Sequence, residues 1–63
     1  MRTVAEKVWD YLVEHKRPVT ANHIAKHFII SPRSVERELR ALVKKNVVVQ
    51  IQVSKPFLYK IMD

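Results

Sequence analysis

The chain has 63 residues with no cysteine and no glycine, and its 12 Lys and Arg against 6 Asp and Glu give a net charge of +6. This length suits one small domain, residues 1–63, with little room for a deep catalytic pocket, so we expect neither an enzyme nor a bound cofactor. No cysteine is present for a disulfide or a thiolate metal site, and no apolar run approaches the roughly 20 residues that span a bilayer. We therefore expect a cytoplasmic protein, without a membrane partner, whose charge attracts polyanions.

The first predicted helix covers residues 3–16, TVAEKVWDYLVEHK. Val8 and Leu12 are part of an apolar stripe at helical spacing. Thr3 is placed to cap the N-terminus, and Glu6 three residues later completes a capping box. The sequence therefore predicts both the helix and its start.

Pro18 is expected to end this helix, because the residue before a proline disfavours helical backbone angles. We expect a short extended segment there and then a second helix over 21–28 with Thr20 as its N-cap. Val19 and Ile24 have the spacing of a hydrophobic staple across that helix start.

The third predicted helix covers 32–45 and begins in the same way, with Ile30 and Val35 as the staple pair and Ser31 as the N-cap. Pro32 stands at the first helical position, where proline is favoured. The core stripe of this helix is Val35, Leu39, Leu42 and Val43.

Without glycine, the turns must be made by other residues. Asn46 follows the last predicted turn of the third helix and is suited to a left-handed capping position. Ile29 stands between the second and third helices, and a β-branched side chain disfavours positive φ. We therefore expect a different backbone path there, or Ile29 held in the core.

Two strands are predicted after the helices. The segment VVVQIQV, 47–53, alternates so that Val47, Val49, Ile51 and Val53 share one face and Gln50 and Gln52 the other. Ser54, Lys55 and Pro56 interrupt it, and a second strand over 57–62 completes a hairpin. The fold class expected is α+β, mostly α.

Charges on the third helix are sorted by face. With Val35 at zero on a wheel of about 100° per residue, Arg33, Arg37, Arg40 and Lys44 fall at about 160°, 200°, 140° and 180°. Glu36 and Glu38 fall at about 100° and 300°, on the two flanks between the basic ridge and the core. This segregation favours a surface that meets anions over a merely solvated face.

The order of helix, helix–turn–helix and hairpin resembles the winged helix-turn-helix superfamily of prokaryotic and phage regulators. The likeness is carried by VTANHIAKHFIISPRSVERELRALVKKNVVVQ, 19–50. In size the chain is similar to the fimbrial-operon regulators of the PapI and FaeA kind, and in pattern to the N-terminal domain of DeoR-type repressors. The resemblance implies a nucleoid-associated transcriptional regulator that binds duplex DNA. Helix 32–45 would lie in the major groove, and the wing, 53–57, would contact the DNA backbone.

Carried over residue by residue, the resemblance places Ser31, Arg33 and Ser34 at phosphates near the start of the third helix. Arg37 and Arg40 are placed to reach guanine. The further candidates for backbone contact are Lys44, Lys55, Lys60, Thr20, Asn22, His23 and Lys26. The protein would act alone, as a homodimer, or beside a larger DNA-binding protein.

Competing interpretations accompany these roles. The arginines could form salt bridges with Glu36 or acids of the first helix, and the basic face could dock an acidic protein partner or RNA. His23 and His27 have a zinc-compatible i, i+4 spacing but lack a third ligand, so no metal site is expected.

The hairpin and the aromatic side chains suggest two further possibilities. KPFLYKI, 55–61, is similar to the closing segment of Z-alpha domains, but Glu36 and Arg40 replace that family's recognition-helix Asn and Tyr, which argues against binding of left-handed DNA. The aromatic side chains are expected to be packing residues, with Tyr59 the one candidate for stacking on a base.

Overall fold

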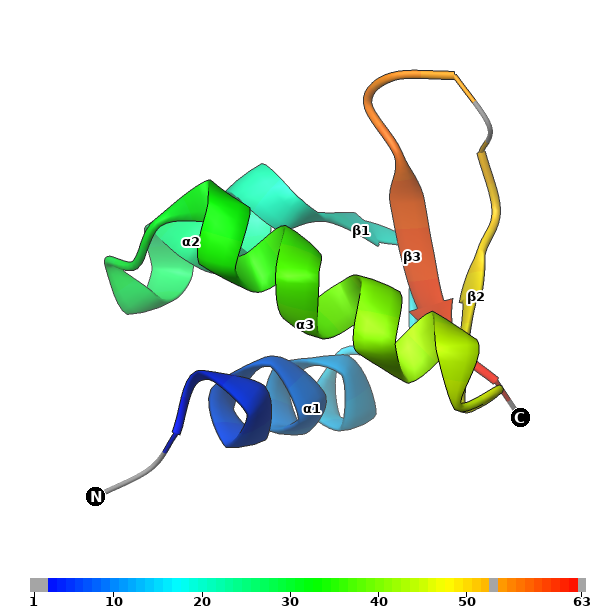
Figure 1. The fold of residues 1–63 in the computed structure, drawn as a ribbon, viewed down its shortest axis with the longest axis horizontal. Coiled ribbons are helices and arrows are strands. Elements are labelled where there is room, and N and C mark those ends of the chain that lie inside the picture. The colour runs from blue at the N-terminus through cyan, green and yellow to red at the C-terminus, as the bar shows by residue number, and fades with distance from the viewer. Residues whose placement is uncertain (1–2, 53, 63) are drawn as a thin grey trace.

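The computed structural model describes residues 3–52 and 54–62, which form a mostly helical α+β domain (Figure 1). The elements are α1 (Val4–Glu14), β1 (Val19–Thr20), α2 (Ala21–Phe28), α3 (Pro32–Lys44), β2 (Val48–Gln50) and β3 (Leu58–Ile61). The expected fold class and the order of helices and hairpin are confirmed, and α2 has the predicted bounds. Helix α1 ends two residues before the predicted end and α3 one residue before it.

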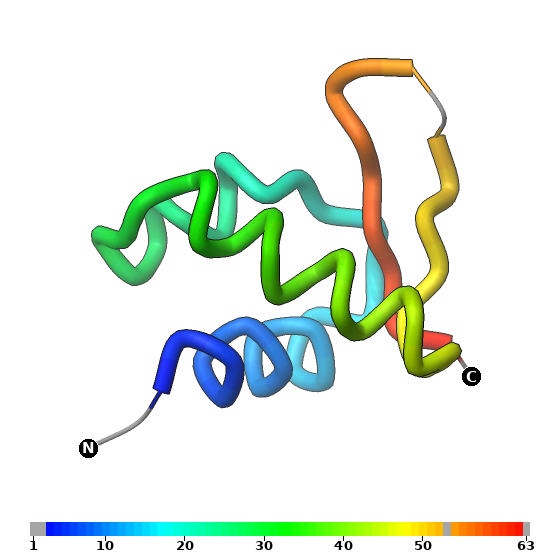
Figure 2. Tube along the Cα trace, in the orientation of Figure 1, coloured from blue at the N-terminus to red at the C-terminus, as the bar shows by residue number. Residues whose placement is uncertain are grey.

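The strands form one antiparallel sheet in the order β1-β3-β2. Val19 pairs with Tyr59 in β3, and Gln50 of β2 pairs with the same tyrosine from the other side. The two-residue β1 thereby joins the segment between α1 and α2 to the C-terminal hairpin, as the chain trace shows (Figure 2). This pairing fixes the start of α2 beside the hairpin.

A single apolar core lies between the three helices and the inner face of the sheet. Val8 and Leu12 of α1, Ile24 of α2 and Val35 and Leu39 of α3 are completely buried. Val48 and Tyr59 extend the core onto the sheet. The predicted helical stripes therefore meet at one centre, and the opposite faces of the helices remain outside.

The helix starts use the predicted N-cap positions, but in different ways. The hydroxyl oxygen of Thr3 accepts a hydrogen bond from the Glu6 N–H, and that of Thr20 accepts one from the His23 N–H, both at 3.2 Å. Ser31 occupies the N-cap position of α3 without a side-chain capping bond. The Ser31 hydroxyl therefore does not cap the helix.

The end of α3 confirms the role expected of Asn46, which has φ 63°. The Asn46 N–H donates to the Val43 carbonyl at 3.0 Å, and the Val47 N–H donates to the Leu42 carbonyl at 3.2 Å. This pair of bonds is a Schellman motif, which satisfies carbonyls that a helix end leaves open. The motif also turns the chain directly into β2.

The expectation for Ile29 was wrong. Ile29 has φ 56° and ψ 55°, in the left-handed region, and its side chain is 91% exposed. Its N–H and that of Ile30 both donate to the Ala25 carbonyl, which closes α2 and redirects the chain into α3. The tight connection between the two helices imposes this backbone conformation despite the branched side chain.

The hairpin strands are shorter than predicted, and their apolar face points outward. Val48 is buried against the helices, whereas Val49 and Ile51 are 39% and 49% exposed. Val47, just before β2, is half-buried and packs against the core, but Val49 and Ile51 lie on the outer face of the sheet, because side chains alternate along a strand. Val53, the last residue expected to share a face with them, lies outside the described residues.

Candidate functional site

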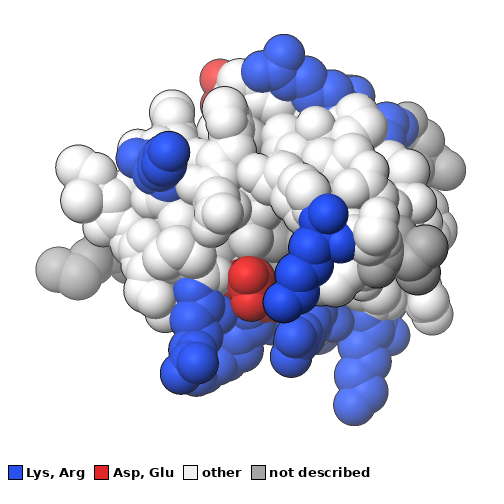
Figure 3. All heavy atoms as spheres, turned by 90° about the horizontal axis from the view of Figure 1, so that it is seen from above, with Lys and Arg blue, Asp and Glu red and all other residues white. Residues whose placement is uncertain are grey.

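The exposed face of α3 is a continuous basic ridge. The four predicted cations are all exposed: Arg33, Arg37, Arg40 and Lys44. The helix has 13 residues, so it is about 20 Å long at 1.5 Å per residue. Figure 3 shows Lys and Arg side chains gathered along one edge of the molecule, with an acidic group at its inner margin. The cations thus form a rod-like positive surface opposite the buried Val35 and Leu39.

The ridge cations form no ion pair with any other residue that the structure describes. Within residues 3–52 and 54–62, no ion pair joins a ridge cation to an acid, although Glu36 and the acids of α1 were the expected competitors. Charged side chains that lack a protein counter-ion keep their attraction for an external anion. The salt-bridge interpretation of Arg37 and Arg40 therefore has no support in the structure.

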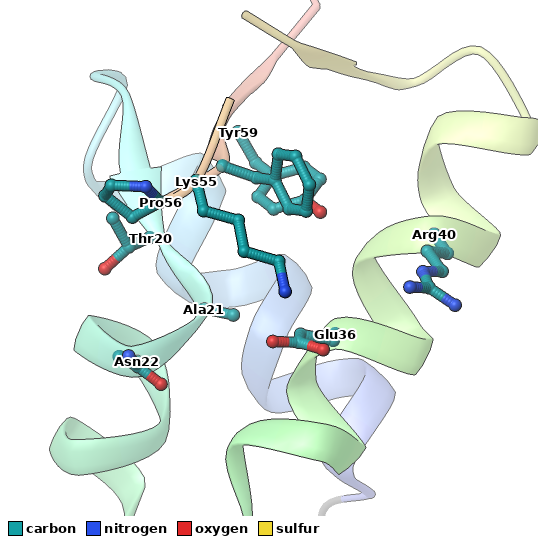
Figure 4. Close-up of a pocket in the computed structure, with 9 residues that line it drawn as sticks. Thr20, Ala21, Asn22, Glu36, Arg40, Lys55, Pro56 and Tyr59 are labelled. Atoms are coloured by element: carbon teal, nitrogen blue, oxygen red, sulfur yellow. The ribbon is translucent and has the colours of Figure 1, made fainter. Parts of the chain in front are cut away.

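Beside the ridge lies a groove of about 400 Å³, bounded by α2, α3 and the hairpin. Its walls are formed by Thr20, Ala21, Asn22, Glu36, Arg40, Lys55, Pro56, Phe57 and Tyr59. In Figure 4, Lys55 extends from the hairpin toward the Glu36 carboxylate, with Thr20 and Asn22 on the opposite wall. Four predicted site residues from three separate segments are thus brought together: Thr20, Asn22, Arg40 and Lys55.

Tyr59 forms the inner wall of this groove. Only 3% of its surface is exposed, so its ring has no free face on which a base could stack, and that expectation was wrong. Burial raises the pKa of the Tyr59 hydroxyl, the Glu36 carboxylate raises it further, and Arg40 acts in the opposite direction. The hydroxyl therefore stays protonated at neutral pH and lies within the electrostatic influence of both α3 side chains.

The remaining candidates lie apart from the groove. Lys26 and Ser31 line a shallow hollow at the turn between α2 and α3, and Ser34 is half-buried. Lys60 follows Tyr59 in β3, so strand alternation puts it on the opposite, outer face of the sheet. The structure therefore separates Lys60 from Lys55, its expected companion in the wing.

Among the remaining histidine and aromatic side chains, Trp9 and Phe28 are half-buried and pack against the core, whereas His23 and His27 are exposed on α2. The rings of His23 and His27 lie 5.8 Å and 5.1 Å from that of Tyr11, which is buried. In the described part of the chain, no group of three metal-binding side chains is found.

Sequence reasoning did not identify Glu36 as part of the site. The helical wheel placed it on a flank, between the ridge and the core, but did not show what faces that flank. The structure shows that the hairpin does, because Lys55 and Tyr59 line the same groove. The long-range pairing of β1 with β3 helps to hold the hairpin in this position, and no local sequence pattern reports that pairing.

None of the helices in the described residues has the length and apolar character needed to cross a membrane. No family model, curated protein or solved structure matches the chain.

Proposed function

We propose that this chain is a winged helix-turn-helix domain that binds duplex DNA, as a small transcriptional regulator of prokaryotic or phage type. The observation that carries the proposal is the ridge of four exposed cations on α3, which has no acidic partner in the described residues. An α-helix fits the major groove of B-DNA, which is about 12 Å wide. The ridge then faces the bases and both flanking strands.

The groove beside α3 supports the same placement. Lys55 on the hairpin and Asn22 near the start of α2 both line this protein groove. Their side chains can therefore donate hydrogen bonds to DNA phosphates that flank the major groove. The Thr20 hydroxyl caps α2 and so fixes the start of that helix beside the groove. In this arrangement the hairpin acts as the wing and α3 as the recognition helix.

The test is fluorescence anisotropy of a labelled random-sequence duplex, titrated with protein at several salt concentrations. We expect a log–log salt slope of about −3 to −5, which corresponds to roughly 3 to 6 phosphates. The variant Arg37→Ala/Arg40→Ala should bind at least about tenfold more weakly, because it loses two contacts in the groove. The stoichiometry at saturation shows whether one copy or two occupy a site.

The matched control is Lys16→Ala/Arg17→Ala, which removes the same charge from exposed positions after α1. This control should retain most of the affinity if α3 is the DNA-binding element. Equal losses in both variants would indicate diffuse attraction rather than a recognition helix. A wild-type protein that leaves the duplex unbound at low salt would refute the proposal and favour an acidic protein as the partner.

A further inference from the structure

The groove between α3 and the hairpin contains one side chain whose charge does not suit DNA phosphates. Lys55 and Arg40 are cations, and Thr20, Asn22 and Tyr59 offer neutral polar groups. The N-terminus of α2, capped by Thr20, adds the positive end of a helix dipole. Glu36 is the only acid among the described residues that line this groove.

This carboxylate is also positioned to face a ligand. Glu36 is exposed, its oxygens make no hydrogen bond or ion pair in the described residues, and Figure 4 shows them directed into the groove below Lys55. A carboxylate only accepts hydrogen bonds when it is ionised. A ligand group that contacts this carboxylate must therefore present a donor, whereas a phosphate oxygen in the same groove would contact Lys55 or Asn22 instead.

We propose that Glu36 is a specificity-determining residue that accepts a hydrogen bond from the N4 amino group of a cytosine in the major groove. This inference rests on the proposed function. In the major groove, the amino donors are cytosine N4 and adenine N6. Adenine places its N7 acceptor beside the amino group, and that acceptor repels a carboxylate, whereas the cytosine edge carries the donor without it.

The position of Arg40 sharpens the inference. Glu36 and Arg40 are four residues apart, so they lie on neighbouring turns, about 6 Å apart along the helix axis. DNA base pairs are stacked about 3.4 Å apart. Arginine pairs best with guanine O6 and N7. The two side chains should therefore select a cytosine and a guanine within one or two base-pair steps of each other.

The experiment is selection of binding duplexes from a random library, followed by sequencing, with the wild type, Glu36→Gln and Glu38→Gln. Glu38→Gln is the matched control, because it removes the same charge from the opposite flank of α3. The wild type and the control should both prefer cytosine at one position, by about 5- to 150-fold over the other bases. In Glu36→Gln that preference should disappear or move to adenine, which pairs with a glutamine amide.

The possible outcomes separate the inference from the function on which it rests. If Glu36→Gln selects the wild-type sequences and only binds them more tightly, Glu36 is an electrostatic neighbour of Lys55 and the inference is overturned. A wild type that binds duplex without any base preference overturns the inference but keeps DNA binding. A wild type that enriches no duplex overturns both.

Discussion

Replacing Ile29 with asparagine should stabilise the domain. A non-glycine residue in the left-handed region costs about 1–2 kcal/mol, and branching at Cβ makes Ile29 a poor choice there. The side chain is 91% exposed, so its removal sacrifices little buried apolar surface. Asparagine tolerates the left-handed conformation much better. We expect the free energy of unfolding to rise by about 1 kcal/mol, which corresponds to a Tm increase of about 4–8 °C in a domain of this size.

Circular dichroism during thermal and urea unfolding measures the effect. The control is Ile29→Val, which keeps the branched Cβ and should leave Tm unchanged. The urea m-value should be the same in all three proteins, because the surface exposed on unfolding hardly differs. A Tm for Ile29→Asn equal to or below that of the wild type would show that the left-handed backbone is not a source of strain. A rise in Ile29→Val would assign the effect to the loss of exposed apolar surface instead.

Two further predictions concern stability. Because burial beside Glu36 raises the pKa of Tyr59 above its ordinary value of about 10, the unfolded chain loses this proton first as pH rises. The contribution of Tyr59 is therefore fully present below about pH 10 and is lost through the folded-state pKa. In urea unfolding, the free energy of unfolding of the wild type should fall relative to that of Tyr59→Phe as pH rises through that range. A difference that does not change with pH would contradict the raised pKa of Tyr59. Asn46→Ala should lower the free energy of unfolding by about 1 kcal/mol, whereas Asn46→Gly should change it by only a few tenths, because glycine also suits the Schellman position. Equal losses in both Asn46 variants would point to the amide side chain rather than the backbone.

The helices were predictable because each carries its own start signal. Thr3 and Thr20 make the capping bonds that the sequence implies, and the stripes through Val8, Ile24 and Leu39 form the observed core. Such signals lie within a few residues of one another, so local physics is enough to interpret them. The conformation of Ile29 was not predictable in this way, because its intrinsic preference is overruled by the closure of α2 against α3.

The basic ridge was likewise a local property, whereas the groove was not. The ridge needs only the period of one helix, which places Arg37 and Arg40 opposite the core. The groove needs Lys55 to approach α3, and that depends on the pairing of β1 with β3 across some 40 residues of sequence. Because this contact is non-local, the sequence indicated which residues are basic but not that Glu36 stands among them.

The local sequence does not determine which face of the hairpin packs against the core. Three consecutive valines, 47–49, allow either face to be apolar, so the pattern does not settle the direction by itself. The Schellman motif at Asn46 settles it, since it fixes where α3 ends and aims Val48 at the core. Helices cover only one side of the sheet, so Val49 and Ile51, which follow Val48 in alternation, face outward despite their hydrophobicity. The exposure of Val49 and Ile51 therefore follows from the capping geometry of α3, and the same geometry places the hairpin beside the helix that carries the basic ridge.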